Sequence, residues 1–223
     1  KLAQDAGIPA GVFSVVTGDR DAGAALAVAP AVSMISFTGS SLTGSKIMNV
    51  CAPKLSQVAL ELGGKSALVV FDDTDLDQAV ETTMKGFLTN GGQICTAHTR
   101  LVVQEGLKAP LLDKLKEELE KLPFCNDPIT EKDRGDRAWE AGMTDVVQPV
   151  VCESQHKKIL GFLDEAKAAG VEVLTGGSVP DAATVGNAGG YFIQPTVLTN
   201  VARDADVWQK EVFGPVLSVR SFS

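Results

Sequence analysis

The stretch Met34-Ile-Ser-Phe-Thr-Gly-Ser-Ser-Leu-Thr-Gly44 indicates the fold class. Its first four residues predict a short buried strand, Thr38–Gly44 predicts a Gly-rich turn, and the spacing of Ser45–Ala52 predicts a helix. Such a turn exposes backbone N–H groups at the positive end of a helix dipole, which suits a phosphate. Because the stretch matches neither GxGxxG nor the Walker pattern, an ordinary helix-opening turn stays open beside a phosphate site.

Strands and helices alternate on both sides of this stretch. Upstream, Val12–Val16 predicts a strand and Asp21–Ala29 a helix. Downstream, the unbroken apolar run of Ser66–Phe71 indicates a strand that is buried on both faces. The alternation predicts an α/β fold with a parallel sheet. The other predicted elements are strands at Gln57–Leu62, Arg100–Gln104, Val171–Leu174, Tyr191–Thr199 and Val216–Phe222, helices at Asp75–Leu88, Ala109–Leu122 and Glu153–Ala169, and an irregular surface loop within 123–150.

Composition narrows the functional class. The 223 residues are 44% hydrophobic and 22% charged, as in an ordinary globular protein of one large or two small domains. The net charge of −8 argues against nucleic-acid binding, although a nucleotide cofactor held by local backbone groups stays compatible with it. No apolar run reaches the roughly 18 residues of a membrane span. The four cysteines have no metal-ligand spacing and predict reduced thiols in a soluble intracellular protein, in the cytoplasm or an organelle.

Two residues are candidates for catalysis. Glu61 is flanked by leucines at the end of a predicted strand, where partial burial would raise its pKa and suit a general base, although a surface carboxylate is the alternative. Cys95 lies in the Gly-containing loop Asn90–Ala97, where a thiol near backbone donors could attack a carbonyl. The alternative for Cys95 is a small buried hydrophobic residue. A cysteine–histidine hydrolase pair with His98 is not supported, because His98 lies on a predicted strand and does not face Cys95.

The segment Lys210–Val216 contains two candidates for cofactor binding. Glu211 could hydrogen-bond a sugar hydroxyl, and Phe213 could line a ring. An ordinary turn made by Gly-Pro is the alternative.

Together these features resemble the aldehyde dehydrogenase superfamily, in the order and at about the spacing of that family's motifs. The segment Trp208-Gln-Lys-Glu-Val-Phe-Gly-Pro-Val resembles the betaine and amino-aldehyde dehydrogenases most. The matching motifs are Phe37-Thr-Gly-Ser40, Glu61-Leu-Gly-Gly-Lys65, Asp72-Asp-Thr-Asp-Leu76, Gly92-Gln-Ile-Cys95, Tyr191-Phe-Ile-Gln-Pro-Thr196 and Glu211-Val-Phe-Gly-Pro215.

The resemblance implies a fold and a reaction. Residues 1–62 would be the C-terminal part of a Rossmann-like NAD(P)-binding domain, and residues 63–223 most of a catalytic domain. An aldehyde would be oxidised to a carboxylic acid, with Cys95 as the nucleophile that forms a thiohemiacetal and then a thioester, and Glu61 as the base that activates water. NAD or NADP would accept the hydride. The implied cofactor-binding residues are Gly39, Ser40, Gly44, Leu62, Glu211 and Phe213. Ser40 would meet the pyrophosphate, the backbone of Leu62 would contact the nicotinamide amide, Glu211 would hold the nicotinamide ribose, and Phe213 would pack near the ring.

The chain also departs from the family's pattern. It is much shorter than the family's chains, an extra stretch follows Asp127-Pro, His98 is atypical, and Cys152 stands where serine is usual. We therefore expect the 223-residue chain to be inactive alone and to associate as a homo-oligomer or within a larger assembly. A truncated, non-catalytic relative with a structural or interaction role stays open as the alternative.

Overall fold

The chain folds into two compact units, Lys1–Gly63 and Gly64–Ser223. A computed structural model describes residues 1–124, 146–185 and 190–223. Both units combine strands with helices, which confirms the α/β class. Most of the irregular loop expected within 123–150 lies outside the described residues.

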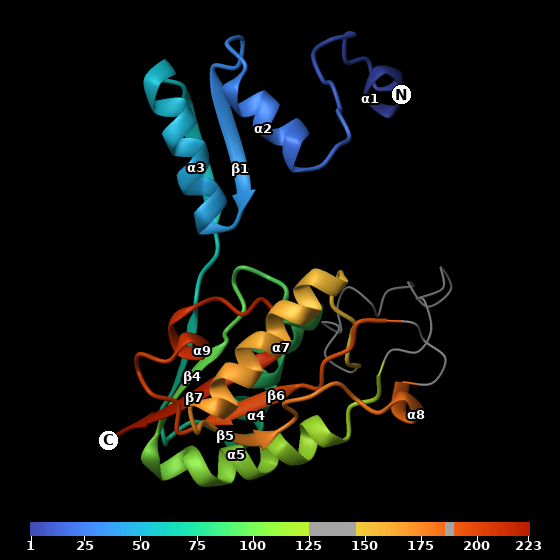
Figure 1. The fold of residues 1–223 in the computed structure, drawn as a ribbon. Coiled ribbons are helices and arrows are strands. Elements are labelled where there is room, and N and C mark those ends of the chain that lie inside the picture. The colour runs from blue at the N-terminus through green and yellow to red at the C-terminus, as the bar shows by residue number, and fades with distance from the viewer. Residues whose placement is uncertain (125–145, 186–189) are drawn as a thin grey trace. The chain divides into compact units, whose positions relative to one another are not determined.

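The first unit is a pair of parallel strands with a helix packed on it (Figure 1). In the register of β1 and β2, Met34 pairs with Gln57 and Gly39 with Leu62. Gly44 lies buried in α3, where a Cβ atom would be 2.7 Å from Cδ2 of Leu62, so the helix packs closely on β2. The elements are α1 (Leu2–Asp5), α2 (Arg20–Val28), β1 (Met34–Gly39), α3 (Ser41–Cys51), a 3₁₀ turn η1 (Ala52–Lys54) and β2 (Gln57–Leu62).

Three expectations for this unit are wrong. The segment expected as a strand at Val12–Val16 has no strand pairing among the described residues, and its valines and phenylalanine are 66–73% exposed. Met34, expected to be buried, is 52% exposed, because the odd and even residues of a strand face opposite sides and α3 covers one side. The expected turn Thr38–Gly44 is shorter, since Ser40 caps α3 directly after β1.

The second unit is built on a five-stranded sheet in the order β3-β4-β7-β6-β5. All neighbouring pairs are parallel except β5 with β6. No helix within the described ranges combines the length and the apolar character that a bilayer crossing requires. The elements are β3 (Ala67–Val70), α4 (Leu76–Leu88), a 3₁₀ turn η2 (Thr89–Gly92), β4 (Arg100–Gln104), α5 (Glu105–Glu120), α7 (Glu153–Ala168), β5 (Glu172–Thr175), α8 (Ala182–Val185), β6 (Thr196–Thr199), α9 (Asp206–Gln209) and β7 (Val216–Phe222).

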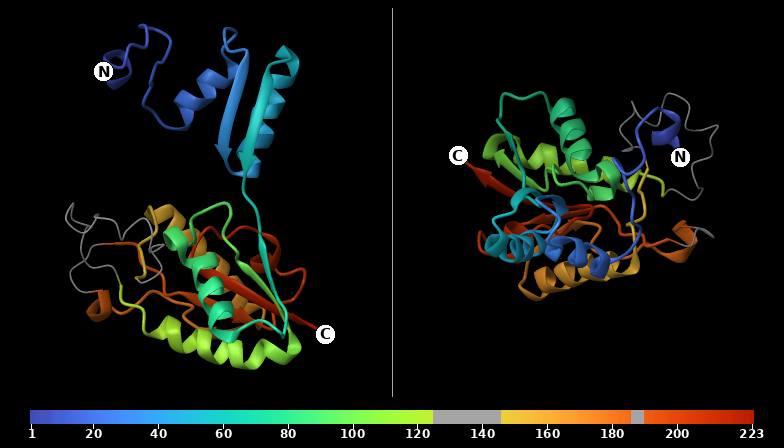
Figure 2. Two further views of the ribbon diagram at one scale, coloured as in Figure 1. Left: turned by 180° about the vertical axis from the view of Figure 1, so that it is seen from behind. Right: turned by 90° about the horizontal axis from the view of Figure 1, so that it is seen from above.

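Helices cover both faces of this sheet. Seen from above, the sheet lies between α4 and α5 on one side and α7 on the other (Figure 2). Leu101 and Val103 of β4 belong to the apolar cluster with α4 and α5, whereas Val102 between them packs against the cluster with α7 and α9. Alternate side chains of β4 therefore pack into two separate apolar cores, and the sheet is the central layer of this unit.

The strand expected to be buried on both faces is an edge strand. In and beside β3, Val69 is 50% and Phe71 54% exposed, because β4 alone pairs with this strand within the described sheet. The fully buried strand is β6, which lies inside the sheet. The expected strand Tyr191–Thr199 is shorter and begins at Thr196.

Two helix glycines predict opposite responses to alanine. At Gly86 of α4 a Cβ atom would lie 2.9 Å from Cβ and Nδ1 of His98, whereas at Gly161 of α7 it would meet nothing within 4 Å. We expect Gly86→Ala to lower the free energy of unfolding by about 1–3 kcal/mol through overpacking. Gly161→Ala should raise it by about 0.5–1 kcal/mol through helix propensity. Urea unfolding of the two variants checks this, and a shift of the same sign in both would contradict it.

Candidate active site

Three segments that are far apart in the sequence meet in the second unit. A Cβ atom at Gly92 would overlap the carbonyl oxygen of Gly214, so the two backbones lie against each other. At Gly64 a Cβ atom would lie 3.4 Å from the carbonyl oxygen of Cys95. The N–H of Gly64 donates to Oε1 of Glu211 over 3.4 Å. The structure thus brings together the motifs that contain Lys65, Cys95 and Glu211.

The loop that carries Cys95 has an unusual backbone. Asn90, Gly91 and Gly92 have φ angles of 54°, 63° and 72°, three successive residues in the left-handed region that favours glycine. The side chains of Asn90 and Gln93 fix the turn, because each donates to the backbone carbonyl of the other, over 3.0 and 3.1 Å. The turn ends α4 and leaves Cys95 exposed. Cys95 is therefore not the small buried hydrophobic residue of the alternative, and its role as a nucleophile stays a prediction.

Two glutamines hold the site together. Oε1 of Gln93 accepts a hydrogen bond of 2.8 Å from the N–H of Val151. Nε2 of Gln155 on α7 donates to the carbonyl oxygens of Val212 and Phe213, over 3.0 and 2.8 Å. Phe213 has a φ of 57°, which costs a non-glycine residue of order 1–3 kcal/mol and persists where the surroundings impose it. The sequence analysis missed Gln155, since nothing in the pattern of its helix marks it.

Lys65 follows Gly64 directly in the sequence. Its Nζ is buried and has no hydrogen-bond partner within the described residues. Burial, and after it the positive charge of Arg100, lower the pKa of Lys65 from its ordinary value of 10.5 to about 8, while the carboxylate of Glu211 opposes both. The site thus contains the buried amine of Lys65, which interacts electrostatically with the carboxylate of Glu211. The motif Glu61–Lys65 contained this residue, but its burial could not be inferred from the sequence.

The first unit holds the other predicted site residues. Oγ of Ser40 caps α3 by accepting from the N–H of Thr43 over 3.2 Å, directly after Gly39 ends β1. Glu61 lies on β2 and is exposed, so the partial burial expected for it is wrong. The reason is that Leu60 and Leu62 turn toward α3, which leaves the glutamate on the opposite face.

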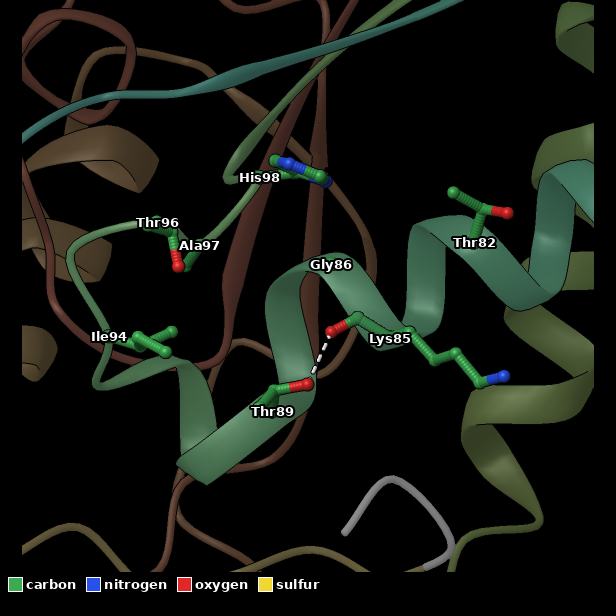
Figure 3. A pocket seen from close by; sticks show the side chains of 8 residues that line it. All are labelled: Thr82, Lys85, Gly86, Thr89, Ile94, Thr96, Ala97 and His98. Carbon is green, nitrogen blue, oxygen red and sulfur yellow. Dashed lines mark hydrogen bonds between the residues drawn. The ribbon is translucent and has the colours of Figure 1, made fainter. Parts of the chain in front are cut away.

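A cavity of about 330 Å³ adjoins the cysteine loop (Figure 3). Ile94 and Thr96, the two neighbours of Cys95 in the sequence, line it, whereas Cys95 itself does not. The opposite wall is α4 and its C-cap, which contribute Thr82, Lys85, Gly86 and Thr89. The cavity therefore lies between α4 and the loop that carries Cys95.

His98 lines the same cavity from the strand side of the loop. Its ring packs against Gly86 of α4, and its backbone N–H donates to the carbonyl of Gly86 over 2.7 Å. Nδ1 is buried without a hydrogen-bond partner in the described parts of the chain. His98 thus joins the loop to the helix.

The chain belongs to the aldehyde dehydrogenase family, because the model of that family matches residues 1–223. It is 43% identical to aminoaldehyde dehydrogenase 1, peroxisomal, from Pisum sativum, and 41% identical to betaine aldehyde dehydrogenase, chloroplastic, from Beta vulgaris. Both matches cover 100% of this chain and 41% of the relative. The chain therefore spans about two fifths of the length of the curated relatives it matches, and the resemblance to this family is confirmed.

Solved structures give the same result. The chain superposes with a TM-score of 0.86 and 37% identity on an NAD-dependent aldehyde dehydrogenase from Sinorhizobium meliloti. With a betaine aldehyde dehydrogenase from Staphylococcus aureus in complex with NAD⁺ the TM-score is 0.87 at 32% identity. Each match covers 100% of this chain and 41% of the solved chain. The α/β fold is thus that of part of an aldehyde dehydrogenase.

The buried amine predicts a pH dependence of stability. Below pH 8 Lys65 is protonated in both states, so the folded chain carries the full cost of burying the charge. That cost falls as the pH rises from about 8 toward 10.5, where the unfolded chain binds more protons. Relative to Lys65→Met, the wild-type chain should gain roughly 1 kcal/mol of stability between pH 7 and pH 9. Urea unfolding of both proteins at the two pH values measures the difference, and a constant difference would refute the assignment.

Proposed function

We propose that this chain supplies the catalytic thiol and part of the cofactor site of an NAD(P)-dependent aldehyde dehydrogenase. The observation that carries the proposal is the exposed Cys95, presented on a loop that is locked against the turn of Glu211 and Phe213. In this proposal residues 1–62 are the C-terminal part of the NAD(P)-binding domain, and residues 63–223 belong to the catalytic domain.

The proposed reaction has two stages. The thiolate of Cys95 attacks the aldehyde carbonyl and forms a thiohemiacetal, while the backbone N–H of Cys95 donates to the developing oxyanion. Loss of a hydride leaves a thioester on Cys95. Glu61 then removes a proton from the water that attacks the thioester, which releases the carboxylic acid and restores the thiol. Only Leu62 and Gly63 separate this glutamate in the sequence from Gly64, which lies against the carbonyl of Cys95.

The described residues fit a dinucleotide. Only Ser40 lies between the end of β1 and the start of α3. The N–H groups of Ser41 and Leu42 in the first turn of α3 have no acceptor within the helix, so they suit a phosphate. Ser40 is exposed at that point. Glu211 offers a carboxylate to a ribose hydroxyl, fixed by the N–H of Gly64. When bound, NAD or NADP would supply the hydride acceptor.

Within this proposal each predicted cofactor residue has a role. Gly39 and Ser40 lie at the pyrophosphate, and Gly44 allows α3 to pack closely on β2. The backbone of Leu62 and the ring of Phe213 lie at the nicotinamide, and Glu211 at its ribose. The roles of Gly39, Ser40 and Gly44 depend on the start of α3. The role of Leu62 depends on the end of β2, and the roles of Glu211 and Phe213 depend on the turn that Gln155 binds.

We also propose that the protein associates, as a homo-oligomer or within a larger assembly. Large apolar side chains are exposed on both units, among them Val12 and Phe13 in the first and Val69 and Phe71 at the edge strand of the second. Exposed apolar surface and a free sheet edge favour association.

Cys95 should be indispensable for turnover, and a second accessible thiol should not. Cys152 is the N-cap residue of α7, and a hydrogen bond with the hydroxyl of Ser154 lowers the pKa of its thiol. Cys152 is therefore the matched control. In protein expressed from its complete gene, Cys95→Ala should abolish NAD(P)H production from betaine aldehyde and simple aldehydes, whereas Cys152→Ala should retain it. An intact-mass spectrum defines the chain assayed. Turnover that survives Cys95→Ala would disprove the nucleophile.

Glu61 should act on the second stage alone. With Glu61→Gln we expect a burst of NAD(P)H equal to the number of sites, followed by steady turnover that is slower by about 10²–10⁴, the usual contribution of a general base. Stopped-flow absorbance with and without added thiol separates the two stages. Loss of the burst itself would place Glu61 in another step and would contradict the proposed role.

A further inference from the structure

The loop that carries Cys95 is fixed to other segments at both ends. At its start the backbone of Gly92 lies on the carbonyl of Gly214. At its end the N–H of His98 donates to a backbone carbonyl of α4 over 2.7 Å. Between these two points, a single hydrogen bond joins the loop to a segment outside it in the part of the chain that the structure describes. That bond is formed by the side chain of Gln93, two residues before Cys95.

Both ends of the Gln93 amide are used. Nε2 donates to the carbonyl of Asn90 over 3.1 Å within the turn, and Oε1 accepts from the N–H of Val151 over 2.8 Å. Gly91 leaves room for this amide, since a Cβ atom there would lie 3.2 Å from Nε2. The side chain is therefore a short bridge, with one end in the turn that precedes Cys95 and the other end outside the loop.

The outer end of the bridge is a backbone that the core holds. Val151 belongs to the segment Val147–Cys152, which leads into α7. On one side of it Val150 is buried in the apolar cluster with α7 and α9, and its N–H donates to the carbonyl of Tyr191 over 2.9 Å. On the other side Cys152 is the N-cap residue of α7. Val151 itself is 78% exposed, so its N–H is presented to Gln93 by a backbone that is fixed on both sides.

The loop and this segment also lie close together along their backbones. A Cβ atom at Gly91 would be 3.6 Å from the carbonyl oxygen of Gln148 and 3.9 Å from that of Pro149. The hydrogen bond of Gln93 is directional, so it sets how the two backbones are aligned.

We propose that Gln93 is a positioning residue for Cys95: its amide ties the loop to the segment Val147–Cys152 and so holds the thiol where it attacks the aldehyde. The inference rests on the proposed dehydrogenase function. A nucleophile reacts fast when it is held near its attacking position, and a displacement of roughly 1 Å can cost about a hundredfold in rate. A side chain with this role acts through supporting hydrogen bonds, without contact to the reacting atoms.

A substitution at Gln93 tests this role in protein from the complete gene. Gln93→Met keeps the length of the side chain and removes both of its hydrogen bonds. We expect kcat/KM for propanal to fall about tenfold, because the thiol spends less time in its attacking position. The dissociation constant of NAD(P)⁺, measured by isothermal titration calorimetry, should stay the same. An unchanged kcat/KM would overturn the inference.

Gln104 provides a matched control on the same unit. Its Oε1 also accepts a hydrogen bond from the backbone N–H of a distant residue, Asp72, over 3.1 Å, at the C-terminal end of β4. Gln104→Met should leave kcat/KM for propanal unchanged. If both variants lose the same activity, and urea unfolding shows the same loss of stability in both, the effect is one of general stability and the inference fails.

The partner of Gln93 can be removed independently. Val151→Pro deletes the N–H donor and leaves Gln93 in place, and the extended pairing of Val150 with Tyr191 suits a residue that precedes proline. We expect Val151→Pro to lower kcat/KM for propanal, and the double variant to be no slower than Gln93→Met, since both changes break one interaction. Losses that add in the double variant would show that Gln93 does not act through Val151, contrary to the proposal.

Hydrogen exchange tests the bridge without reference to turnover. The N–H of Ala97 donates to the carbonyl of Ile94 over 3.0 Å within the loop. Exchange of this amide should be faster in Gln93→Met than in the wild-type protein or in Gln104→Met, because a loop without its tie opens more often. The same exchange rate in all three proteins would refute the bridge.

Failure of the proposed function has a different signature. If the wild-type protein produces no NAD(P)H from propanal in a Cys95-dependent manner, the proposed function fails, and the inference that rests on it fails as well. If turnover depends on Cys95 and is unaffected by Gln93→Met, the inference alone fails.

Discussion

The backbone of Gly92 lies directly on the carbonyl of Gly214, and the rest of the site in the second unit depends on that contact. Neither position has room for a side chain, since a Cβ atom at Gly214 would overlap Ile159 of α7. The cysteine loop is thus stacked on the Gly-Pro turn, and the turn on the helix. Such stacking of backbones positions the loop that carries Cys95.

This arrangement carries strain that the two cores of the unit support. Asn90 and Phe213 are non-glycine residues in the left-handed region, and Lys65 is a buried amine without a hydrogen-bond partner in the described chain. Each is unfavourable by itself. They persist because the sheet is covered on both faces, and because Gln155 and the amide of Gly64 hold the turn from two sides. Strain of this kind is common where a protein pre-organises chemical groups.

The loop that carries Cys95 has two neighbourhoods in the second unit. Cys95 is exposed on its loop, while its two neighbours in the sequence line the adjoining cavity. One loop therefore exposes a thiol and also contributes to the wall of a cavity.

The sequence by itself determined the α/β class, the limits of β4 and β7, and the residue types of the site, because periodicity and motif order are local properties. It could not show that β3 is an edge strand or that Glu61 is exposed, since burial depends on which elements pack on each face. It also gave no sign of Gln155. Only the tertiary structure joined the segments around Gly64, Gly92 and Gly214, because contacts between backbones distant along the chain leave no periodic signal in the residues that make them.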